Sequence, residues 1–266
     1  MAGILESLFR MDDRVVVVNG GAGRIGSKMC LALGDAGAKV VVLDLDAERA
    51  ESVAGRVRTE VSGQALAVAV DSTCPNGLSN ALATIQDKFG LPYGLINSTQ
   101  FRGSGFYGSD PADHPLDAWN QVFNVNVTGV LLACQVFGKA MMERGGGSII
   151  NVSSTYGVVS ADPRIYGDSG VNSPISYAGS KSAILNMTRY LAVHWREKNI
   201  RVNCLVPGGV FDNQGDEFVS NYCDRTPLGR MAKAEDYQGA TLFMLSDASS
   251  YMTGATVTVD GGWTAW

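Results

Sequence analysis

Residues 15–33 read VVVVNGGAGRIGSKMCLAL, and this stretch decides the fold class. A β-branched apolar run typical of a buried strand leads through closely spaced glycines into an apolar pattern of helical period. Gly21, Gly23 and Gly26 satisfy the spacing G-x-G-x-x-G. Glycines at such a turn let the backbone approach a pyrophosphate at the positive end of the helix. The expected cofactor contacts in this dinucleotide-binding unit are Gly20, Gly23, Arg24, Ile25 and Gly26.

An acidic residue strengthens this interpretation. In VVLDLD, Asp44 ends the next strand-like run, at the distance where a carboxylate accepts hydrogen bonds from the adenosine ribose hydroxyls. The same carboxylate would repel a 2′-phosphate, and Leu45, not a basic residue, follows it. NAD is therefore favoured as the cofactor, while Arg24 and Arg49 keep NADP possible.

The rest of the chain alternates strand-like and helical patterns. Strands are expected at 15–18, 40–43, 65–70, 94–97, 148–152, 200–205 and 256–259, and helices at 25–36, 47–61, 75–89, 116–143, 176–198 and 234–246. This rhythm predicts a single α/β domain over residues 1–266, a Rossmann-type doubly wound parallel sheet of about seven strands with helices on both faces. Residues 1–13 form an N-terminal extension. The segment 158–175, rich in Gly, Ser and Pro, is expected to be an inserted active-site loop.

Composition and charge exclude several classes of function. The 266 residues carry a formal charge of −5, with 45% hydrophobic and 18% charged residues, as in a soluble globular protein. No basic run predicts a nucleic-acid or membrane partner. Five scattered cysteines and two separated histidines predict neither a disulfide framework nor a metal site. We expect a cytoplasmic protein, because no signal peptide or long apolar run is present.

A tyrosine and a lysine lie one helical turn apart near the start of a later helix. Tyr177 and Lys181 are four residues apart, so their side chains share one face. A nearby ammonium favours the tyrosinate and moves its pKa from about 10 toward the range useful to a general base. Tyr156 and Tyr166 have no lysine at this spacing and are not expected to be the base. An exposed helical pair is the alternative interpretation.

With these motifs the chain resembles the short-chain dehydrogenase/reductase family from about Arg14 to its C-terminus. The Tyr-x-x-x-Lys signature of the family stands here as YAGSK at 177–181. The other matching motifs, in the order usual for the family, are NVNVTG at 124–129, GSIINVSS at 147–154, IRVNCLVPGG at 200–209, and PLGR to SSYMTGATVTVDGG at 227–262.

The resemblance implies a catalytic tetrad and a reaction. Tyr177 corresponds to the general acid/base, Lys181 to the residue that lowers its pKa and binds the nicotinamide ribose, and Ser154 to the hydroxyl that holds the substrate oxygen. Asn126 corresponds to the asparagine that supports a proton-relay water. Further implied cofactor contacts are Asp71, Asn97, Pro207, Gly208 and Val210. The implied activity is hydride transfer between nicotinamide and a secondary alcohol or ketone.

The chain departs from the family pattern in its glycine turn, after the fourth strand, and most of all in the length of one loop. The interval from Ser154 to Tyr177 spans 23 positions, about twice the length usual in the family. Long insertions often form lids or binding loops, so this loop is expected to border the substrate. Arg164 is a candidate for pairing with a carboxylate or phosphate, and Tyr166 and Gln100 are candidates for sugar contacts. A solvated loop is the alternative.

The ending VDGGWTAW and the loop together resemble a subset of the family associated with bacterial surface-sugar pathways, including flagellin glycans and sialic-acid-like sugars. This implies a sugar, sugar acid or nucleotide-activated sugar as the small-molecule substrate. Two alternatives stay open: a redox-neutral sugar-nucleotide epimerase or dehydratase, and a cofactor-sensing binding protein without turnover. The family commonly forms tetramers through the helices at 116–143 and 176–198, so a homotetramer or dimer is expected.

Overall fold

The protein contains a seven-stranded parallel sheet with the strand order β3-β2-β1-β4-β5-β6-β7. The computed structural model describes residues 3–103, 110–169 and 171–266. The strands are β1 (Val15–Asn19), β2 (Lys39–Asp44), β3 (Gln64–Ala69), β4 (Gly94–Asn97), β5 (Gly147–Val152), β6 (Ile200–Pro207) and β7 (Thr256–Val259). The order reverses between β1 and β4, which is the switch point where doubly wound sheets bind their ligands. The predicted fold class is confirmed.

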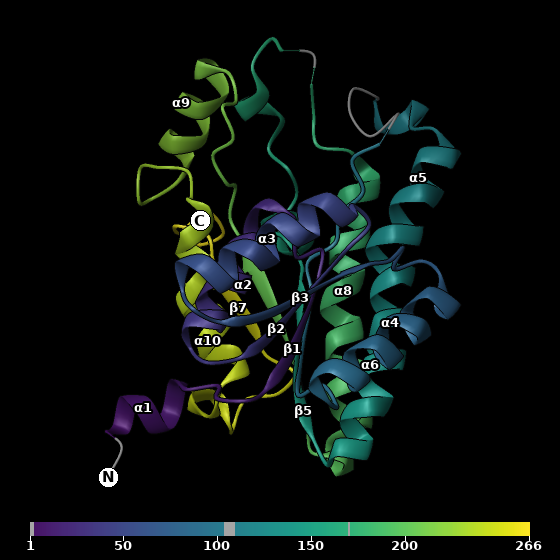
Figure 1. Ribbon diagram of the computed structural model, residues 1–266. Helices are drawn as coiled ribbons and strands as arrows, with labels where there is room; N and C mark the ends of the chain where they lie inside the picture. The colour runs from purple at the N-terminus through teal and green to yellow at the C-terminus, as the bar shows by residue number, and fades with distance from the viewer. Residues whose placement is uncertain (1–2, 104–109, 170) are drawn as a thin grey trace.

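Helices cover both faces of this sheet (Figure 1). One face packs against α2 (Arg24–Asp35), α3 (Ala47–Glu60) and α10 (Gln238–Leu245), and the other against α4 (Pro75–Phe89), α6 (Gly129–Arg144) and α8 (Ile175–His194). The other helical elements are α1 (Ile4–Phe9), α5 (Leu116–Phe123), α7 (Thr155–Val158) and α9 (Asp216–Arg225), with a π-helical turn at Asn124–Thr128 and 3₁₀ turns at Pro111–Asp113, Pro163–Tyr166, Arg196–Lys198, Ala234–Tyr237 and Asp247–Ser249.

The central strand shows why an unbroken valine run forms part of this sheet. Val16 and Val18 of β1 belong to the core on one face, and Val15 and Val17 to the core on the other. Side chains alternate between the faces of a strand, and helices bury both faces of a parallel sheet. Burying each such side chain contributes about 1.5–3 kcal/mol.

The predicted helix at 116–143 is present as the continuous stretch α5, π turn and α6. Within the described residues, Leu116–Arg144 is the one helical stretch long and apolar enough to cross a membrane, and half of its most apolar window is buried. Its contacts with α4 and β5 account for this apolar character. The sequence pattern did not predict α9, a mostly polar helix in which Tyr222 is the buried residue.

Candidate active site

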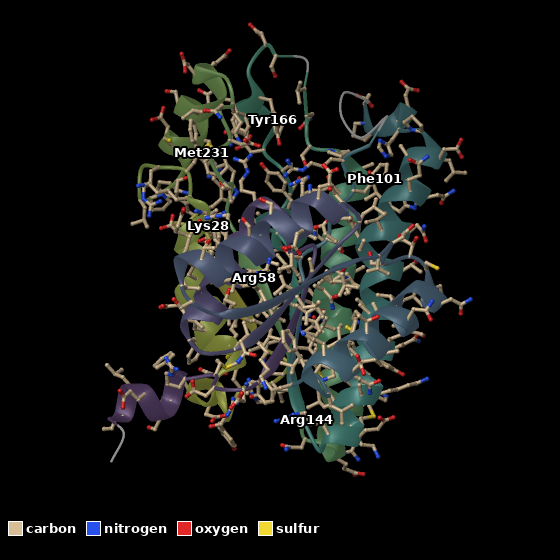
Figure 2. The ribbon with its side chains drawn as sticks, in the orientation of Figure 1. Lys28, Arg58, Phe101, Arg144, Tyr166 and Met231 are labelled. Atoms are coloured by element: carbon tan, nitrogen blue, oxygen red, sulfur yellow. The ribbon has the colours of Figure 1, made fainter. Side chains whose placement is uncertain are left out.

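A pocket of about 710 Å³ lies at the carboxyl ends of the central strands. In Figure 2, Tyr166 and Met231 lie on one side of this end of the molecule and Phe101 on the other. The pocket brings together these predicted residues: Gly20, Gly23, Arg24, Ile25, Asp44, Asp71, Gln100, Ser154, Tyr166, Tyr177, Lys181, Pro207, Gly208 and Val210. The lining drawn from the described residues does not include Gly26, Asn97, Asn126 or Arg164.

The glycine turn between β1 and α2 forms one wall of the pocket. Gly20 has a φ of +81°, which favours glycine. A Cβ on Gly26 would stand 2.3 Å from the carbonyl oxygen of Gly20, so Gly26 allows the helix to begin tightly against the turn. Gly23 is the N-cap of α2 and supplies no side-chain cap. The first N–H groups of α2 are therefore available to a pyrophosphate, and the turn fits a dinucleotide.

Asp44 stands at the carboxyl end of β2, where the strand meets this turn. Its Oδ2 accepts a hydrogen bond of 3.0 Å from the backbone of Ala22, and its Oδ1 accepts one of 3.3 Å from that of Asp46. Two arginines line the same part of the pocket, and both contact protein acceptors. Arg49 donates to the carbonyl of Ala22 at 2.9 Å. Arg24 donates to the carbonyl of Phe211 at 2.8 Å and forms an ion pair with Asp212.

The turn after β6 closes the opposite wall and is held by two tyrosines. The backbone N–H of Gly209 donates to the hydroxyl oxygen of Tyr222 at 2.6 Å. The hydroxyl of Tyr237 donates to the carbonyl of Gly208 at 3.0 Å. These bonds fix the segment that contains Pro207, Gly208 and Val210. Neither tyrosine was predicted from the sequence, because each comes from a helical element distant in the chain.

Tyr177 and Lys181 lie on the first two turns of α8, facing the end of β5. The Lys181 Nζ lies 5.8 Å from the centroid of the Tyr177 ring and donates to the carbonyl of Val152 at 3.0 Å. Lys181 is only 3% exposed. Burial lowers the pKa of its ammonium to about 8. The geometry thus places the buried ammonium of Lys181 beside the phenol of Tyr177.

Two serines, Ser153 and Ser154, follow β5, and their hydroxyls differ in whether they are available to a ligand. Ser153 donates to the carbonyl of Lys181 at 2.7 Å and thereby ties β5 to α8. The Ser154 oxygen accepts a hydrogen bond of 3.2 Å from the backbone of Tyr156. No acceptor for the Ser154 proton occurs in the part of the chain that the structure describes. Ser154 can therefore donate to a substrate oxygen.

Asn126 lies in the π-helical turn between α5 and α6, a feature often found at functional sites. Its Oδ1 accepts a hydrogen bond of 2.9 Å from the backbone of Phe101, and its Nδ2 donates to the hydroxyl of Ser180 at 3.1 Å. The side chain therefore joins the segment after β4 to α8, the helix that bears Tyr177 and Lys181. Its support of a relay water stays a prediction.

Asn97 belongs to a buried chain of amides, and its predicted contact with the cofactor stays a prediction. It accepts a hydrogen bond from Asn19 at 3.2 Å and donates to Asn151 at 2.9 Å. Asn151 in turn donates to Thr188 at 3.1 Å. The chain connects β1, β4, β5 and α8, so both polar ends of the Asn97 amide are engaged inside the sheet.

An aromatic wall lines the pocket, with residues from α7, the inserted loop and α9. We use this name for Tyr156, Tyr166, Phe218 and Tyr222, all of which line the pocket. The hydroxyls of Tyr156 and Tyr166 lie 3.5 Å apart, and the rings of Tyr166 and Phe218 have centroids 5.3 Å apart. Tyr222 stacks at 4.3 Å on Trp263, which comes from the ending VDGGWTAW. Burial raises the pKa of Tyr156, which keeps its hydroxyl neutral.

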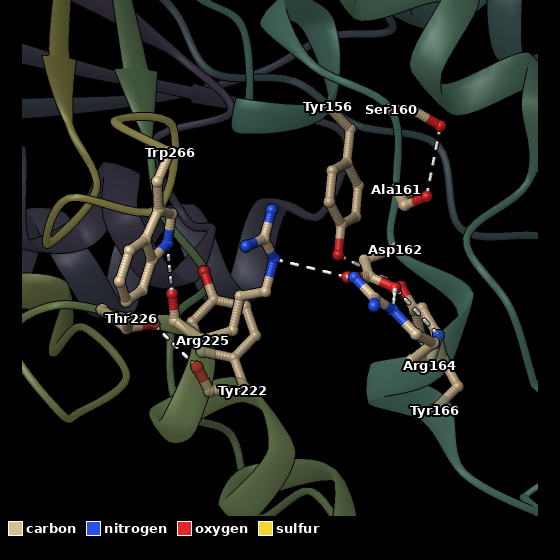
Figure 3. Close-up of polar contacts among 10 residues, drawn as sticks. All are labelled: Tyr156, Ser160, Ala161, Asp162, Arg164, Tyr166, Tyr222, Arg225, Thr226 and Trp266. Atoms are coloured by element: carbon tan, nitrogen blue, oxygen red, sulfur yellow. Dashed lines mark hydrogen bonds and ion pairs between the residues drawn. The ribbon is translucent and has the colours of Figure 1, made fainter.

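Arg164 is not among the residues that line the pocket, and Figure 3 shows its side chain in contact with Asp162. Its Nε and Nη2 donate to the carboxylate of Asp162 at 2.9 and 2.7 Å, and the side chain is 83% exposed. Asp162 also lies 3.3 Å from the Nε of Arg225. The hydrogen bond from Arg164 lowers the pKa of Asp162 to about 2. The carboxylate of Asp162 thus accepts two hydrogen bonds from the guanidinium group of Arg164.

Comparisons with known proteins agree with this geometry. The family described as Enoyl-(Acyl carrier protein) reductase matches residues 20–264. Galactitol 2-dehydrogenase (L-tagatose-forming) of Cereibacter sphaeroides is 32% identical over 271 residues, which cover 98% of this chain and 99% of that protein. The chain therefore belongs to the short-chain dehydrogenase/reductase family, and it is a dehydrogenase/reductase acting on CH–OH groups.

Two solved structures extend the likeness to the whole chain. A short chain dehydrogenase from Leptospira borgpetersenii serovar Hardjo-bovis with bound NAD+ has a TM-score of 0.84 at 31% identity, covering 99% of this chain and 97% of that one. A gluconate 5-dehydrogenase from Burkholderia cenocepacia J2315 in complex with NADP and tartrate has a TM-score of 0.88 at 26% identity, covering 98% and 99%. A nicotinamide cofactor is therefore supported for this fold.

Proposed function

We propose that the protein is an NAD(H)-dependent dehydrogenase that interconverts a secondary alcohol and a ketone of a sugar, sugar acid or nucleotide-activated sugar. The observation that carries this proposal is the convergence of Ser154, Tyr177 and Lys181 on one pocket that also contains Asp44. A sensor or binding protein without turnover does not need the hydroxyl of Ser154 together with the phenol of Tyr177 and the ammonium of Lys181.

In the oxidation direction, the Tyr177 phenolate takes the proton of the substrate hydroxyl while Ser154 donates a hydrogen bond to the same oxygen. The carbinol C–H bond breaks as the C=O bond forms, and the proton held by Tyr177 then leaves to solvent. A bound nicotinamide would supply the acceptor for the carbinol hydrogen and its two electrons. Lys181 keeps a positive charge beside the phenolate and lowers the cost of forming it. Reduction follows the same path backwards.

Preference for NAD is supported by the residues around Asp44. Its carboxylate is positioned by the backbone N–H groups of Ala22 and Asp46 and has lone pairs left for ribose hydroxyls. A 2′-phosphate would meet this negative charge. The two arginines that would compensate it, Arg24 and Arg49, already bond to protein acceptors.

A polyhydroxylated substrate is supported by the aromatic wall. Aromatic rings pack on the C–H faces of a sugar chain, and the hydroxyls of Tyr156 and Tyr166 can exchange hydrogen bonds with its hydroxyls. The names of the relatives, galactitol 2-dehydrogenase and gluconate 5-dehydrogenase, refer to compounds of this kind. The surface-sugar pathway stays part of the proposal.

The proposal includes a cytoplasmic homo-oligomer, a tetramer or dimer, associated through α6 and α8. Leu132, Val136 and Phe137 of α6 pack into the core, whereas Leu131, Tyr190 and Val193 are exposed on the two helices. Exposed apolar residues on two neighbouring helices suit a contact between copies. Light scattering that gives a monomer mass at every concentration would refute this part.

The test follows NADH and NADPH absorbance with polyols, sugar acids and free or nucleotide-activated ketosugars. Turnover should prefer NADH and vanish in Tyr177→Phe. Tyr251→Phe is the matched control, because the side chain of Tyr251 is fully exposed and does not line the pocket. Redox-neutral conversion of a nucleotide sugar by the wild type would support the epimerase alternative instead. NADH binding without any conversion would support the sensor.

A further inference from the structure

Four cationic side chains line the pocket, and three of them bond to protein acceptors. Arg24 contacts Phe211 and Asp212, Arg49 contacts Ala22, and Lys181 contacts Val152. The fourth, Arg102, lies five positions after the end of β4 and is exposed to the pocket. Across residues 3–103, 110–169 and 171–266, no side-chain hydrogen bond or ion pair to Arg102 occurs. An arginine in this state has its planar fork of donors available to a ligand.

The backbone beside Arg102 is fixed at a definite place. The N–H of Phe101 donates to the buried Oδ1 of Asn126, whose amide nitrogen donates to Ser180 on the catalytic helix. On the other side, a Cβ on Gly103 would stand 2.3 Å from the Phe101 ring, so the chain folds closely over that ring. The backbone next to Arg102 is therefore connected by hydrogen bonds to α8, the helix that bears Tyr177 and Lys181.

Arg102 is also close enough to Lys181 to have an electrostatic effect on it. Its charge contributes to lowering the pKa of Lys181, after the larger effect of burial. The adenosine end is instead marked by Asp44. An anion held by Arg102 would thus lie toward the reacting carbon. The aromatic wall lines the same pocket.

We propose that Arg102 is the substrate-specificity residue of this pocket and binds the carboxylate of a polyhydroxylated acid. This inference rests on the proposed dehydrogenase function and narrows its substrate class to sugar acids. A carboxylate matches a guanidinium fork through two parallel hydrogen bonds. A phosphate dianion is disfavoured, because the other pocket cations are engaged and Asp44, Asp71 and Asp212 add negative charge to the same cavity.

The experiment compares substrates that differ only at the anion. The compounds are D-gluconate and D-glucitol, and the matching aldonate and alditol pairs of four and five carbons. Their affinity is measured by titration into the protein saturated with NADH. Their oxidation is assayed separately with NAD at pH 7. The variants are Arg102→Gln and Arg102→Lys. Arg196→Gln is the control for charge, because Arg196 is 69% exposed and paired with Glu197. Arg164→Gln tests the other candidate arginine.

We expect the acid-to-alditol ratio of kcat/KM, and of affinity, to fall about 10- to 100-fold in Arg102→Gln, as expected for a charge-assisted pair. Arg102→Lys should recover part of it, and Arg196→Gln should keep the wild-type ratio. An equal response to acids and alditols, a fall of the ratio in Arg164→Gln, or a raised KM for NAD in Arg102→Gln would each overturn the inference. Turnover of alditols alone would overturn the proposed role of Arg102 but would still support the proposed dehydrogenase function. Absence of all turnover would instead refute the proposed function, and the titrations would still decide the role of Arg102.

Discussion

The ammonium of Lys181 lies 5.8 Å from the ring centroid of Tyr177, and burial lowers the pKa of Lys181 to about 8. The charge that favours the phenolate is therefore present below pH 8 and is lost as the pH rises through it. For ketone reduction, where Tyr177 must also carry its proton, kcat/KM should be level near pH 6–7 and decline above about pH 8. Pre-steady-state or steady-state profiles from pH 6 to 10 measure this.

The matching variant is Lys181→Met, which should lose about 100-fold or more of kcat/KM at pH 7 and no longer show the decline near pH 8. Lys139→Met is the control, because Lys139 is exposed on α6. A wild-type profile that stays level to pH 10 would show that the charge of Lys181 does not govern the reaction.

Asp44 should set the choice between NADH and NADPH. In Asp44→Asn, one side-chain oxygen still accepts the backbone bond, but the charge that opposes a 2′-phosphate is gone. The NADH-to-NADPH ratio of kcat/KM should fall about 10- to 100-fold, the scale of one hydrogen bond to a charged group. Asp87→Asn, at an exposed position of α4, should keep the ratio. An unchanged ratio in Asp44→Asn would contradict the assignment.

The sequence predicted the elements whose cause is local. A valine run that ends in glycines specifies β1, the turn and α2, because close backbone approaches such as Gly26 to Gly20 leave no alternative residue. Tyr177 and Lys181 share a face through helical spacing alone. Boundaries shifted by one or two residues at several elements, as helix and strand ends commonly do. Larger differences occur at two helices: α8 ends at His194 and α10 begins at Gln238, because 3₁₀ turns occupy most of the rest of the two predicted ranges.

The features that the sequence did not predict depend on segments that meet only in the folded chain. Phe218 and Tyr222 join the aromatic wall because α9 packs on the inserted loop, and nothing in the polar pattern of α9 indicates this. The sequence predicted Arg164 as an anion ligand and gave no reason to choose Arg102. Only the structure shows that Asp162 engages the first and that the second lines the pocket.

The carboxylate of Asp162 should hold the inserted loop against α9. Its pKa is lowered to about 2, so both arginine contacts are complete above about pH 4 and are lost only as the pH falls from 4 toward 2. Protection of residues 158–175 from proteolysis should therefore be constant between pH 5 and 8 in the wild type. In Asp162→Asn the loop should be cut faster, with the substrate KM raised about two- to fivefold, as for partly exposed ion pairs.

Asp168→Asn is the control for this loop, because Asp168 is exposed within the same segment. Protection that rises or falls between pH 5 and 8 in the wild type, or equal cleavage of the two variants, would show that another contact holds the loop.

Gly157 should set the distance between Ser154, the proposed substrate-binding serine, and α8. A Cβ at this position would stand 2.5 Å from the hydroxyl of Ser153 and 2.8 Å from the carbonyl of Lys181, so α7 would have to move away from α8. Ser154, the N-cap of α7, would move with it. Gly157→Ala should lower kcat by about 10-fold or more while the Kd for NADH changes little, since misplacing a catalytic group by about 1 Å costs up to 100-fold.

Gly55→Ala provides the control for this substitution. Gly55 lies inside α3, and a Cβ there meets only the flexible end of Arg58 at 3.7 Å. This variant should keep wild-type kcat and gain about 0.5–1 kcal/mol of stability from helix propensity, measured by denaturant unfolding. If Gly157→Ala instead loses NADH affinity in parallel with kcat, the contact between α7 and α8 supports the whole pocket and does not act on Ser154 alone.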